Sequence, residues 1–204
     1  MSERGKLITL EGVDGAGKST HIPFIAKRLR EQGKTVVVTR EPGGTPLAEK
    51  LREMVLKEPM DALAETLLMF AARADHVRQV IRPALEAGSW VVCDRFSDAT
   101  AAYQGAGKGV PAELIKQLAE ATHPGLRPDR TLVFDCPYEI ASQRLRSNGR
   151  DLDRFEREDR PFFERVRDAY LERGQAEPGR LRIIDASAAL SQIEKELEKN
   201  LLFY

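Results

Sequence analysis

A glycine-rich stretch near the start of the chain has the residue types and spacing that hold the phosphates of a nucleotide. The run Gly12-Val13-Asp14-Gly15-Ala16-Gly17-Lys18-Ser19, followed by Thr20, satisfies the pattern G-x-x-x-x-G-K-S/T. Glycines in such a loop let backbone N–H groups turn inward around an anion, and the start of the following helix adds partial positive charge. Lys18 then reaches the β- and γ-phosphates, while the Ser19 hydroxyl ligates Mg²⁺. Residues 12–20 are therefore predicted to be a phosphate site.

The segments on both sides of this loop provide the context that the chemistry requires. Residues 6–11 are typical of a short buried strand, and residues 21–32 carry apolar side chains at helical spacing. Strand, glycine loop and helix in this order place the loop at a helix N-terminus. An ordinary glycine-rich turn would need neither neighbour.

Short apolar runs alternate with helical patterns along the rest of the chain. Strands are predicted at 6–11, 35–39, 90–93, 130–135 and 181–184, and helices at 21–32, 47–57, 61–87, 111–121, 138–146, 162–173 and after a candidate N-cap at Ser187. Pro83 is expected to kink or break the long helix at 61–87. Because such crossovers are right-handed, we predict an α/β fold with a mostly parallel five-stranded sheet covered on both faces.

Polar residues follow each of the first three predicted strands. The glycine loop follows the first strand, residues 40–44 follow the second, and Asp94-Arg95 ends the third. In an open parallel sheet, ligands bind outside the carboxyl ends of the strands. We therefore expect these three clusters to meet at one edge, where a second ligand faces the phosphate loop.

Composition excludes several classes of protein. Lysine plus arginine number 32 and aspartate plus glutamate number 32, so no overall charge draws the 204-residue chain to nucleic acid or an anionic membrane. No run approaches the ~18 apolar residues that cross a bilayer, and the N-terminus lacks the apolar core of a signal peptide. Cys93 and Cys136 lie in apolar runs and are expected to be buried thiols. A single domain in the reducing cytoplasm is predicted.

Among proteins with such a loop, a small phosphotransferase fits this chain best. A switch GTPase needs an N-K-x-D motif, which is absent, and the single D-x-x-G lies inside the glycine loop. A phosphotransferase must hold an acceptor in line with the donor's γ-phosphate and exclude water. We therefore expect arginines on an acceptor site and further arginines on a mobile lid.

Several short motifs, taken together and in order, resemble those of the bacterial thymidylate kinases. They are residues 11–20 (E-G-V-D-G-A-G-K-S-T), 39–44 (T-R-E-P-G-G), 70–73 (F-A-A-R), 94–96 (D-R-F), 102–105 (A-Y-Q-G), 152–156 (L-D-R-F-E) and 185–186 (D-A). The resemblance implies a P-loop NTPase-type three-layer α/β/α domain over residues 1–204, with a lid at about 147–160. It further implies direct in-line transfer of the ATP γ-phosphate to dTMP, with Mg²⁺, to give dTDP for dTTP synthesis.

The same resemblance implies how the acceptor nucleotide is held. The Asp14 carboxylate takes the sugar 3′-hydroxyl, and the Tyr103 ring crowds the 2′ position and so favours deoxyribose. Arg73 hydrogen-bonds the thymine, and Phe70 is the ring expected to stack on it, although Met69 stands four residues before Arg73, where many relatives have the aromatic. The expected dTMP-binding set is Asp14, Arg40, Pro42, Arg52, Phe70, Arg73, Arg95, Thr100, Tyr103 and Gln104.

The donor side of the site is expected to combine the glycine loop with more distant cations. The loop has no arginine, so charge in the transition state must be met from elsewhere. By charge pattern alone the segment 147–160 is a solvated face, but as a lid it would bring Arg150 or Arg154 onto the γ-phosphate. The expected catalytic residues are Lys18, Arg95, Arg150 and Arg154. The expected ATP-binding residues are Gly12, Val13, Asp14, Gly15, Ala16, Gly17, Lys18, Ser19 and Thr20. The resemblance adds Arg144, which packs on the adenine. Ser19 is expected to ligate Mg²⁺, with Asp94 as a partner of Lys18 or of Mg²⁺ through water.

Two alternatives are compatible with the residues alone. One is another nucleoside or nucleoside-monophosphate kinase with a different base, and the other is a nucleotide-binding regulator that transfers nothing. Arginines suited to an acceptor site and a lid favour an enzyme over a regulator. The resemblance implies a homodimer through the long helices, and ATP and dTMP as the partners, without nucleic acid or membrane.

Overall fold

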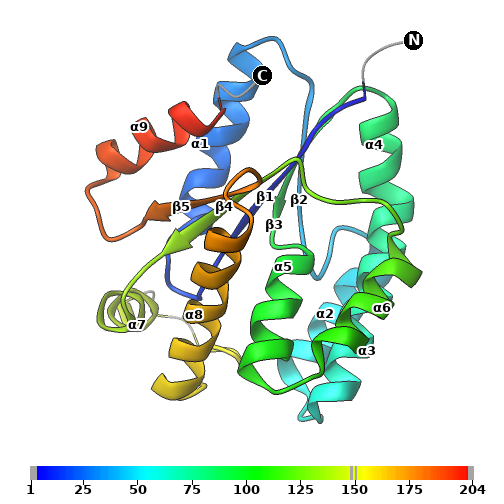
Figure 1. Cartoon of the computed structure of the whole chain (residues 1–204), viewed down its shortest axis with the longest axis vertical. Helices are drawn as coiled ribbons and strands as arrows, with labels where there is room; N and C mark the ends of the chain where they lie inside the picture. The colour runs from blue at the N-terminus through cyan, green and yellow to red at the C-terminus, as the bar shows by residue number, and fades with distance from the viewer. Residues whose placement is uncertain (1–3, 148, 150, 202–204) are drawn as a thin grey trace.

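Five strands form one parallel sheet at the centre of the molecule (Figure 1). The computed structural model describes residues 4–147, 149 and 151–201. The strands are β1 (Leu7–Gly12), β2 (Val36–Arg40), β3 (Trp90–Asp94), β4 (Arg130–Asp135) and β5 (Leu181–Asp185), in the order β2-β3-β1-β4-β5. All four strand pairs are parallel, which confirms the predicted sheet.

Helices cover both faces of this sheet, so the fold has three layers. Helices α1 and α9 pack on one face, and α4, α5 and α8 pack on the other (Figure 1). The helices are α1 (Lys18–Glu31), α2 (Pro46–Lys57), α3 (Ala62–His76), α4 (Arg82–Glu86), α5 (Ser97–Thr100), α6 (Ala112–Thr122), α7 (Tyr138–Ser147), α8 (Arg160–Ala176) and α9 (Leu190–Leu201), with π-helices η1 (Val77–Ile81) and η2 (Ala101–Gly107). In the described part of the chain no helix has the length and apolarity of a membrane span.

The central strand β1 divides its side chains between the two faces. Ile8 and Leu10 pack in the core cluster that includes Ile25 of α1, whereas Leu7 packs with Ile81 and other residues of the opposite face. Side chains alternate along a strand, so Glu11 points to the same face as Leu7. The strand's last residues thus place a fully buried carboxylate beside α8, directly before the glycine loop.

Local capping signals define where several helices begin. The Thr45 hydroxyl accepts the Ala48 N–H at 3.0 Å, and the Asp159 carboxylate accepts the Phe162 N–H at 2.8 Å. Each of these caps is followed by a proline, which suits the first turn because it lacks an N–H. These caps fix the first residues of α2 and α8.

The long helical stretch predicted at 61–87 runs as α3, η1 and α4, so the regular α-helix is interrupted just upstream of Pro83 and then continues into α4. One local prediction was wrong. Ser187 is not the N-cap of α9, because its hydroxyl donates to Asp185 at 2.5 Å. The helix begins at Leu190, and the Gln192 side chain accepts the preceding Ala189 N–H.

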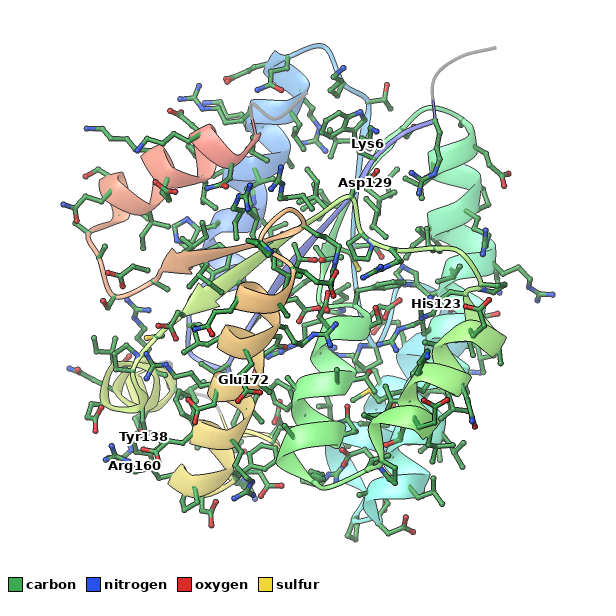
Figure 2. The ribbon with its side chains drawn as sticks, in the orientation of Figure 1. Lys6, His123, Asp129, Tyr138, Arg160 and Glu172 are labelled. Carbon is green, nitrogen blue, oxygen red and sulfur yellow. The ribbon has the colours of Figure 1, made fainter. Side chains whose placement is uncertain are left out.

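Charged side chains tie the ends of several elements together at the surface. Figure 2 shows Lys6 and Asp129 beside one another, where Asp129 also accepts the Leu7 N–H at 2.8 Å. At the far end of the molecule the Arg160 guanidinium lies 5.2 Å from the centre of the Tyr138 ring (Figure 2). The second contact joins the start of α7 to the start of α8, on both sides of the expected lid.

Candidate active site

The carboxyl ends of β1, β2 and β3 open into one cleft of about 570 Å³, which we call the phosphate cleft. The glycine loop forms its floor, and Asp94 and Arg95 stand at the end of β3. Its lining includes Asp14, Gly15, Ala16, Gly17, Lys18, Ser19, Thr20, Arg40, Arg52, Asp94, Arg95 and Arg144. The structure therefore brings together the three polar clusters that were predicted at the strand ends.

Close packing explains two of the glycines in the loop. A Cβ on Gly12 would lie 2.3 Å from the Phe134 carbonyl oxygen, and one on Gly15 would lie 2.4 Å from the Ala141 carbonyl oxygen. Both glycines also have positive φ, at 126° and 80°, which disfavours any side chain. The loop can thus hold its inward-turned backbone only with glycine at these positions.

The Lys18 ammonium lies inside the glycine loop. Its Nζ donates to the Gly12 and Val13 carbonyl oxygens, each at 2.9 Å, and the residue is only 6% exposed. Burial and the nearby Arg95 charge lower the pKa of Lys18 to about 8. An anionic phosphate in the cleft would favour the charged ammonium and so raise the pKa of Lys18 again.

Asp14 and Arg95 form an ion pair across the mouth of the loop. Arg95 Nη2 lies 2.6 Å from Asp14 Oδ1, and the Tyr103 hydroxyl donates to Asp14 Oδ2 at 2.8 Å. Although burial alone would raise it, the charges of Arg95 and Lys18 lower the pKa of Asp14. Arg95 also has a φ of 67°, which costs a non-glycine residue energy. The strain lies in the Arg95 backbone, and its side chain lines both the cleft and a neighbouring pocket.

A second, smaller cavity of about 80 Å³ opens beside the cleft, and we call it the inner pocket. Apolar side chains such as Met69, Phe96 and Phe155 line it together with several convergent charged and polar groups, as is typical of a site for a small ligand. Its lining includes Asp14, Glu41, Pro42, Arg52, Met69, Arg73, Arg95, Phe96, Thr100, Tyr103, Gln104, Asp153 and Phe155.

Arg73 is the most constrained cation of the inner pocket. It is 3% exposed, its Nε lies 2.6 Å from Glu41, and its Nη2 donates to the Phe96 carbonyl and to the Thr100 hydroxyl. In the described part of the chain its Nη1 has no hydrogen-bond partner. Such a buried donor is costly, so a ligand acceptor is expected to complete it.

Phe70 does not line the inner pocket, contrary to the prediction. It is 2% exposed and packs with Val110 and Ile115, whereas Met69 lines the pocket. The Phe70 ring lies 4.9 Å from the Arg73 guanidinium and so supports Arg73 from the core side. One residue along a helix is a turn of 100°, and that rotation separates the pocket from the core.

The remaining acceptor residues lie at the walls of the two cavities. Arg52 donates to the Pro42 carbonyl at 2.9 Å and lines both cavities, and the Glu41–Pro42 peptide bond is cis. Arg40 lines the phosphate cleft but not the inner pocket. Its side chain is 53% exposed, and its Nη2 lies 2.9 Å from Glu49 Oε2. These guanidinium groups thus reach the cleft from β2 and α2.

Of the two predicted lid arginines, the structure describes Arg154, which does not line the phosphate cleft. Arg150 lies outside the described residues. Arg154 lines neither cavity, because it donates to the Val55 carbonyl at 2.8 Å and lies 2.5 Å from Glu65. Instead, Asp153 lines both cavities and Phe155 lines the inner pocket, so the segment 151–159 contributes to the walls.

Arg144 lies at the opposite rim of the phosphate cleft. It donates to the Ala186 carbonyl at 2.9 Å and to the Ala16 carbonyl at 3.4 Å. These bonds hold its guanidinium plane against the glycine loop, where a flat base could stack on it.

The residues present fit a magnesium ion held mainly by phosphates and water. Ser19 and Asp94 line the same cleft, and Asp94 Oδ1 is buried without a hydrogen-bond partner among the described residues. In the described ranges no group of three or more carboxylate, imidazole or thiol side chains is arranged to hold a metal ion. Mg²⁺ keeps several waters and few protein ligands at such sites, so this sparse set is sufficient.

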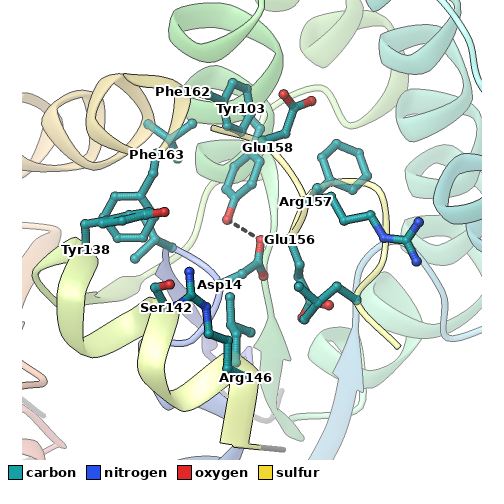
Figure 3. Close-up of a pocket in the computed structure, with 15 residues that line it drawn as sticks. Asp14, Tyr103, Tyr138, Ser142, Arg146, Glu156, Arg157, Glu158, Phe162 and Phe163 are labelled. Carbon is teal, nitrogen blue, oxygen red and sulfur yellow. Dashed lines mark hydrogen bonds between the residues drawn. The ribbon is translucent and has the colours of Figure 1, made fainter. Parts of the chain in front are cut away.

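A third cavity, of about 330 Å³, lies between α7, α8 and the segment 151–158 (Figure 3). Figure 3 shows the rings of Tyr103, Tyr138, Phe162 and Phe163 around it, with the Tyr103–Asp14 hydrogen bond at its edge. Its walls hold none of the loop from Gly15 to Ser19, so we assign no phosphate to it. It is the space that the segment leaves on its α7–α8 side, and we call it the aromatic cavity.

Two buried carboxylates at the site were not predicted. Glu41 joins Arg73 to His76, and Glu11 accepts the Phe96 N–H and the Tyr170 hydroxyl, each at 2.7 Å. Burial raises the pKa of Glu11 to about 7, and the negative charge of Asp98 adds to this. The available signal was an acidic residue at the end of a predicted strand or just after one.

Comparisons with known proteins agree with this geometry. The family model for thymidylate kinase matches residues 10–197. The thymidylate kinase of Bordetella pertussis is 57% identical over 198 residues, covering 97% of this chain and 95% of its own, and that of Ectopseudomonas mendocina is 55% identical, covering 95% and 93%. The crystal structure of thymidylate kinase from Ehrlichia chaffeensis superposes with a TM-score of 0.79 at 34% identity, covering 97% of this chain and 99% of that one.

Proposed function

The chain belongs to the thymidylate kinase family, whose members phosphorylate dTMP to dTDP with ATP, and we propose that this chain does so by direct in-line transfer with Mg²⁺. One observation carries the proposal. The phosphate cleft and the inner pocket share a wall made of Asp14, Glu41, Arg52, Arg95 and Asp153. Two phosphorylated ligands in these cavities would therefore meet across Arg52 and Arg95, and like charges brought so close need such cations between them.

The donor is proposed to lie in the phosphate cleft. Backbone N–H groups of the glycine loop and the start of α1 hold its phosphates, Lys18 reaches the β- and γ-phosphates, and Arg144 packs on the adenine. Ser19, with Asp94 through water, would hold Mg²⁺, which supplies charge neutralisation at the transferring phosphate. This places the γ-phosphate toward the Arg95 side of the cleft.

The acceptor is proposed to extend from the shared wall into the inner pocket. Arg95, Arg52 and Arg40 bind its 5′-phosphate, and Asp14 accepts the sugar 3′-hydroxyl, while the Tyr103 ring excludes a 2′-hydroxyl. Arg73 Nη1, the buried donor without a partner, supplies a hydrogen bond to a thymine carbonyl. The nucleophile is an oxygen of the acceptor phosphate, so the protein contributes position and charge rather than a covalent step.

Three further features of the protein are proposals. Arg150 is proposed to supply the cation that the glycine loop lacks, as the sequence and the resemblance imply. A homodimer is proposed through α2 and α3, whose Leu47, Met54, Leu63 and Leu67 are 47–50% exposed. The buried free cysteines suit a reducing cytoplasm, where we expect the reaction to run.

An acceptor panel tests the proposed reaction. ADP release is measured with ATP, Mg²⁺ and each of dTMP, dUMP, dCMP, AMP and GMP. The proposal expects the largest kcat/KM with dTMP and none above background without Mg²⁺. Preference for a purine monophosphate would contradict the assignment of the inner pocket, and tight ATP binding without transfer to any acceptor would indicate a regulator.

A further inference from the structure

A carboxylate that lines none of the three cavities connects the inner pocket with the segment 151–159. Glu65 on α3 is fully buried, and each of its oxygens has partners. Oε1 accepts a hydrogen bond from Gln104 Nε2 at 2.7 Å. Oε2 accepts one from Lys108 Nζ at 2.8 Å and lies 2.5 Å from Arg154 Nη2. One buried anion thus holds residues from η2, from the loop after it and from the expected lid.

The hydrogen bond to Glu65 fixes which end of the Gln104 amide can contact a ligand. An ionised carboxylate is an acceptor only, so Gln104 must turn its NH₂ group toward Glu65. Its amide oxygen then points away from Glu65, and Gln104 lines the inner pocket. The inner pocket is thereby lined by Gln104, with its amide oxygen as a fixed acceptor, and by Arg73, with Nη1 as a fixed donor.

This pair of groups matches one edge of one kind of base. Thymine and uracil present O4 as an acceptor and N3–H as a donor, whereas cytosine presents an amino donor and an unprotonated N3 acceptor. A donor from Arg73 and an acceptor from Gln104 complement the first pattern and oppose the second. If the Gln104 amide could rotate freely, this distinction would weaken.

The other oxygen of Glu65 holds the segment 151–159 on its α2–α3 side. Arg154 is bound to Glu65 and also donates to the Val55 carbonyl of α2. Lys108 pairs with Glu158 of the segment at 3.5 Å and lies 4.7 Å from the centre of the Phe155 ring. On its opposite side the segment leaves the aromatic cavity unfilled. On its α2–α3 side, Glu65 and the two cations beside it therefore anchor the segment.

We propose that Glu65 is a positioning residue that couples recognition of the pyrimidine edge to the docking of segment 151–159. The inference rests on the proposed function, because it takes the inner pocket to hold the base of dTMP. Glu65 sets the Gln104 amide through one oxygen and the segment through the other. Since Phe155 and Asp153 of the docked segment line the inner pocket, the base and the segment stabilise the same arrangement.

The test uses Glu65→Gln, which keeps the shape but can donate as well as accept. We expect the ratio of kcat/KM for dTMP to that for dCMP to fall roughly tenfold or more, because Gln104 can now present either end. Trypsin cleavage after the arginines of 151–159 should become several-fold faster. Glu113→Gln, exposed on α6, is the matched control and should change neither measurement.

Two more variants test base recognition and segment docking separately, and they keep the proposal testable if Glu65→Gln does not fold. Gln104→Leu should lower the ratio of kcat/KM for dTMP to that for dCMP, and Arg154→Ala should speed trypsin cleavage of the segment. If the base and the segment are coupled, saturating dTMP should protect the segment from trypsin less in Gln104→Leu than in the wild type. Equal protection in both, or an unchanged ratio and cleavage rate in a folded Glu65→Gln, would overturn the inference. If the wild type does not turn over dTMP, that result would instead refute the proposed function.

Discussion

Arg95 Nη2 lies 2.6 Å from Asp14 Oδ1, so the cation expected to bind the acceptor phosphate and the anion expected to bind its sugar are paired with each other. The Tyr103 hydroxyl lies between them, donating to Asp14 and accepting from Arg95 at 2.9 Å. Asp14 thereby holds the strained Arg95 in place before any substrate binds. A nucleotide that offers both a phosphate and a hydroxyl can replace this internal pair.

Substitution of Arg95 separates its chemical role from its backbone strain. Arg95→Ala and Arg95→Gly both remove the guanidinium, so both should lower kcat/KM for dTMP by roughly 10²-fold or more. Only glycine relieves the cost of the positive φ, so Arg95→Gly should be about 1 kcal/mol more stable than Arg95→Ala. Urea unfolding and ADP release measure the two effects. Equal stabilities would contradict the strain, and unchanged activity would remove Arg95 from the site.

Lys18→Ala tests the donor side. The ammonium is buried among the loop carbonyls and is expected to move to the phosphates when ATP binds. Its loss should lower kcat by at least roughly 10³-fold while leaving the unfolding midpoint within a few degrees of the wild type. Circular dichroism and ADP release provide the two measurements. Near-normal turnover would refute the phosphate-loop assignment.

Most of the fold and the overall plan of the site could be predicted from the sequence. Each strand is a short apolar run with a turn signal after it, and the parallel arrangement follows from the intervening helices. The strand-end rule then placed Lys18, Arg40 and Arg95 around one cleft, which the structure confirms geometrically.

What could not be predicted depended on contacts between distant segments. Phe70 and Met69 are adjacent, and only packing against Val110 shows which one faces the core. Arg154 looks like any lid arginine until Glu65, 89 positions earlier in the sequence, appears opposite it. A buried glutamate such as Glu65 cannot be distinguished in the sequence from the solvated glutamates of other helices, because its burial depends on partners from other elements.

The two lid arginines should differ in their effects. Arg150→Ala is expected to lower kcat more than it raises KM, because a cation at the γ-phosphate acts mainly in the transition state. In the structure Arg154 is bound to Glu65, so Arg154→Ala should change both KM and kcat. If both changed KM alone, the segment would only bind substrate and would not contribute to transfer. The double variant should also lower kcat more than it raises KM.

The buried Glu11 carboxylate should make stability depend on pH near neutrality. Burial and the charge of Asp98 raise the pKa of Glu11 from an ordinary 4.5 to about 7. Between these values the folded chain keeps a proton that the unfolded chain has released, so this contribution to stability is complete below 4.5 and is lost as the pH rises to about 7. The loss amounts to about 3 kcal/mol.

Glu11→Gln removes this titration while keeping the shape of the side chain. Its amide oxygen can accept the Phe96 N–H, and its NH₂ can donate to the Tyr170 oxygen. Relative to the wild type, the free energy of unfolding of the variant should therefore increase by about 2 to 3 kcal/mol between about pH 5 and about pH 8. Urea unfolding at several pH values measures this difference, with Glu113→Gln as a control whose difference stays flat. A Glu11→Gln difference that is also flat, or that falls as the pH rises, would show that Glu11 is ionised throughout and that Arg95 and Tyr170 outweigh its burial.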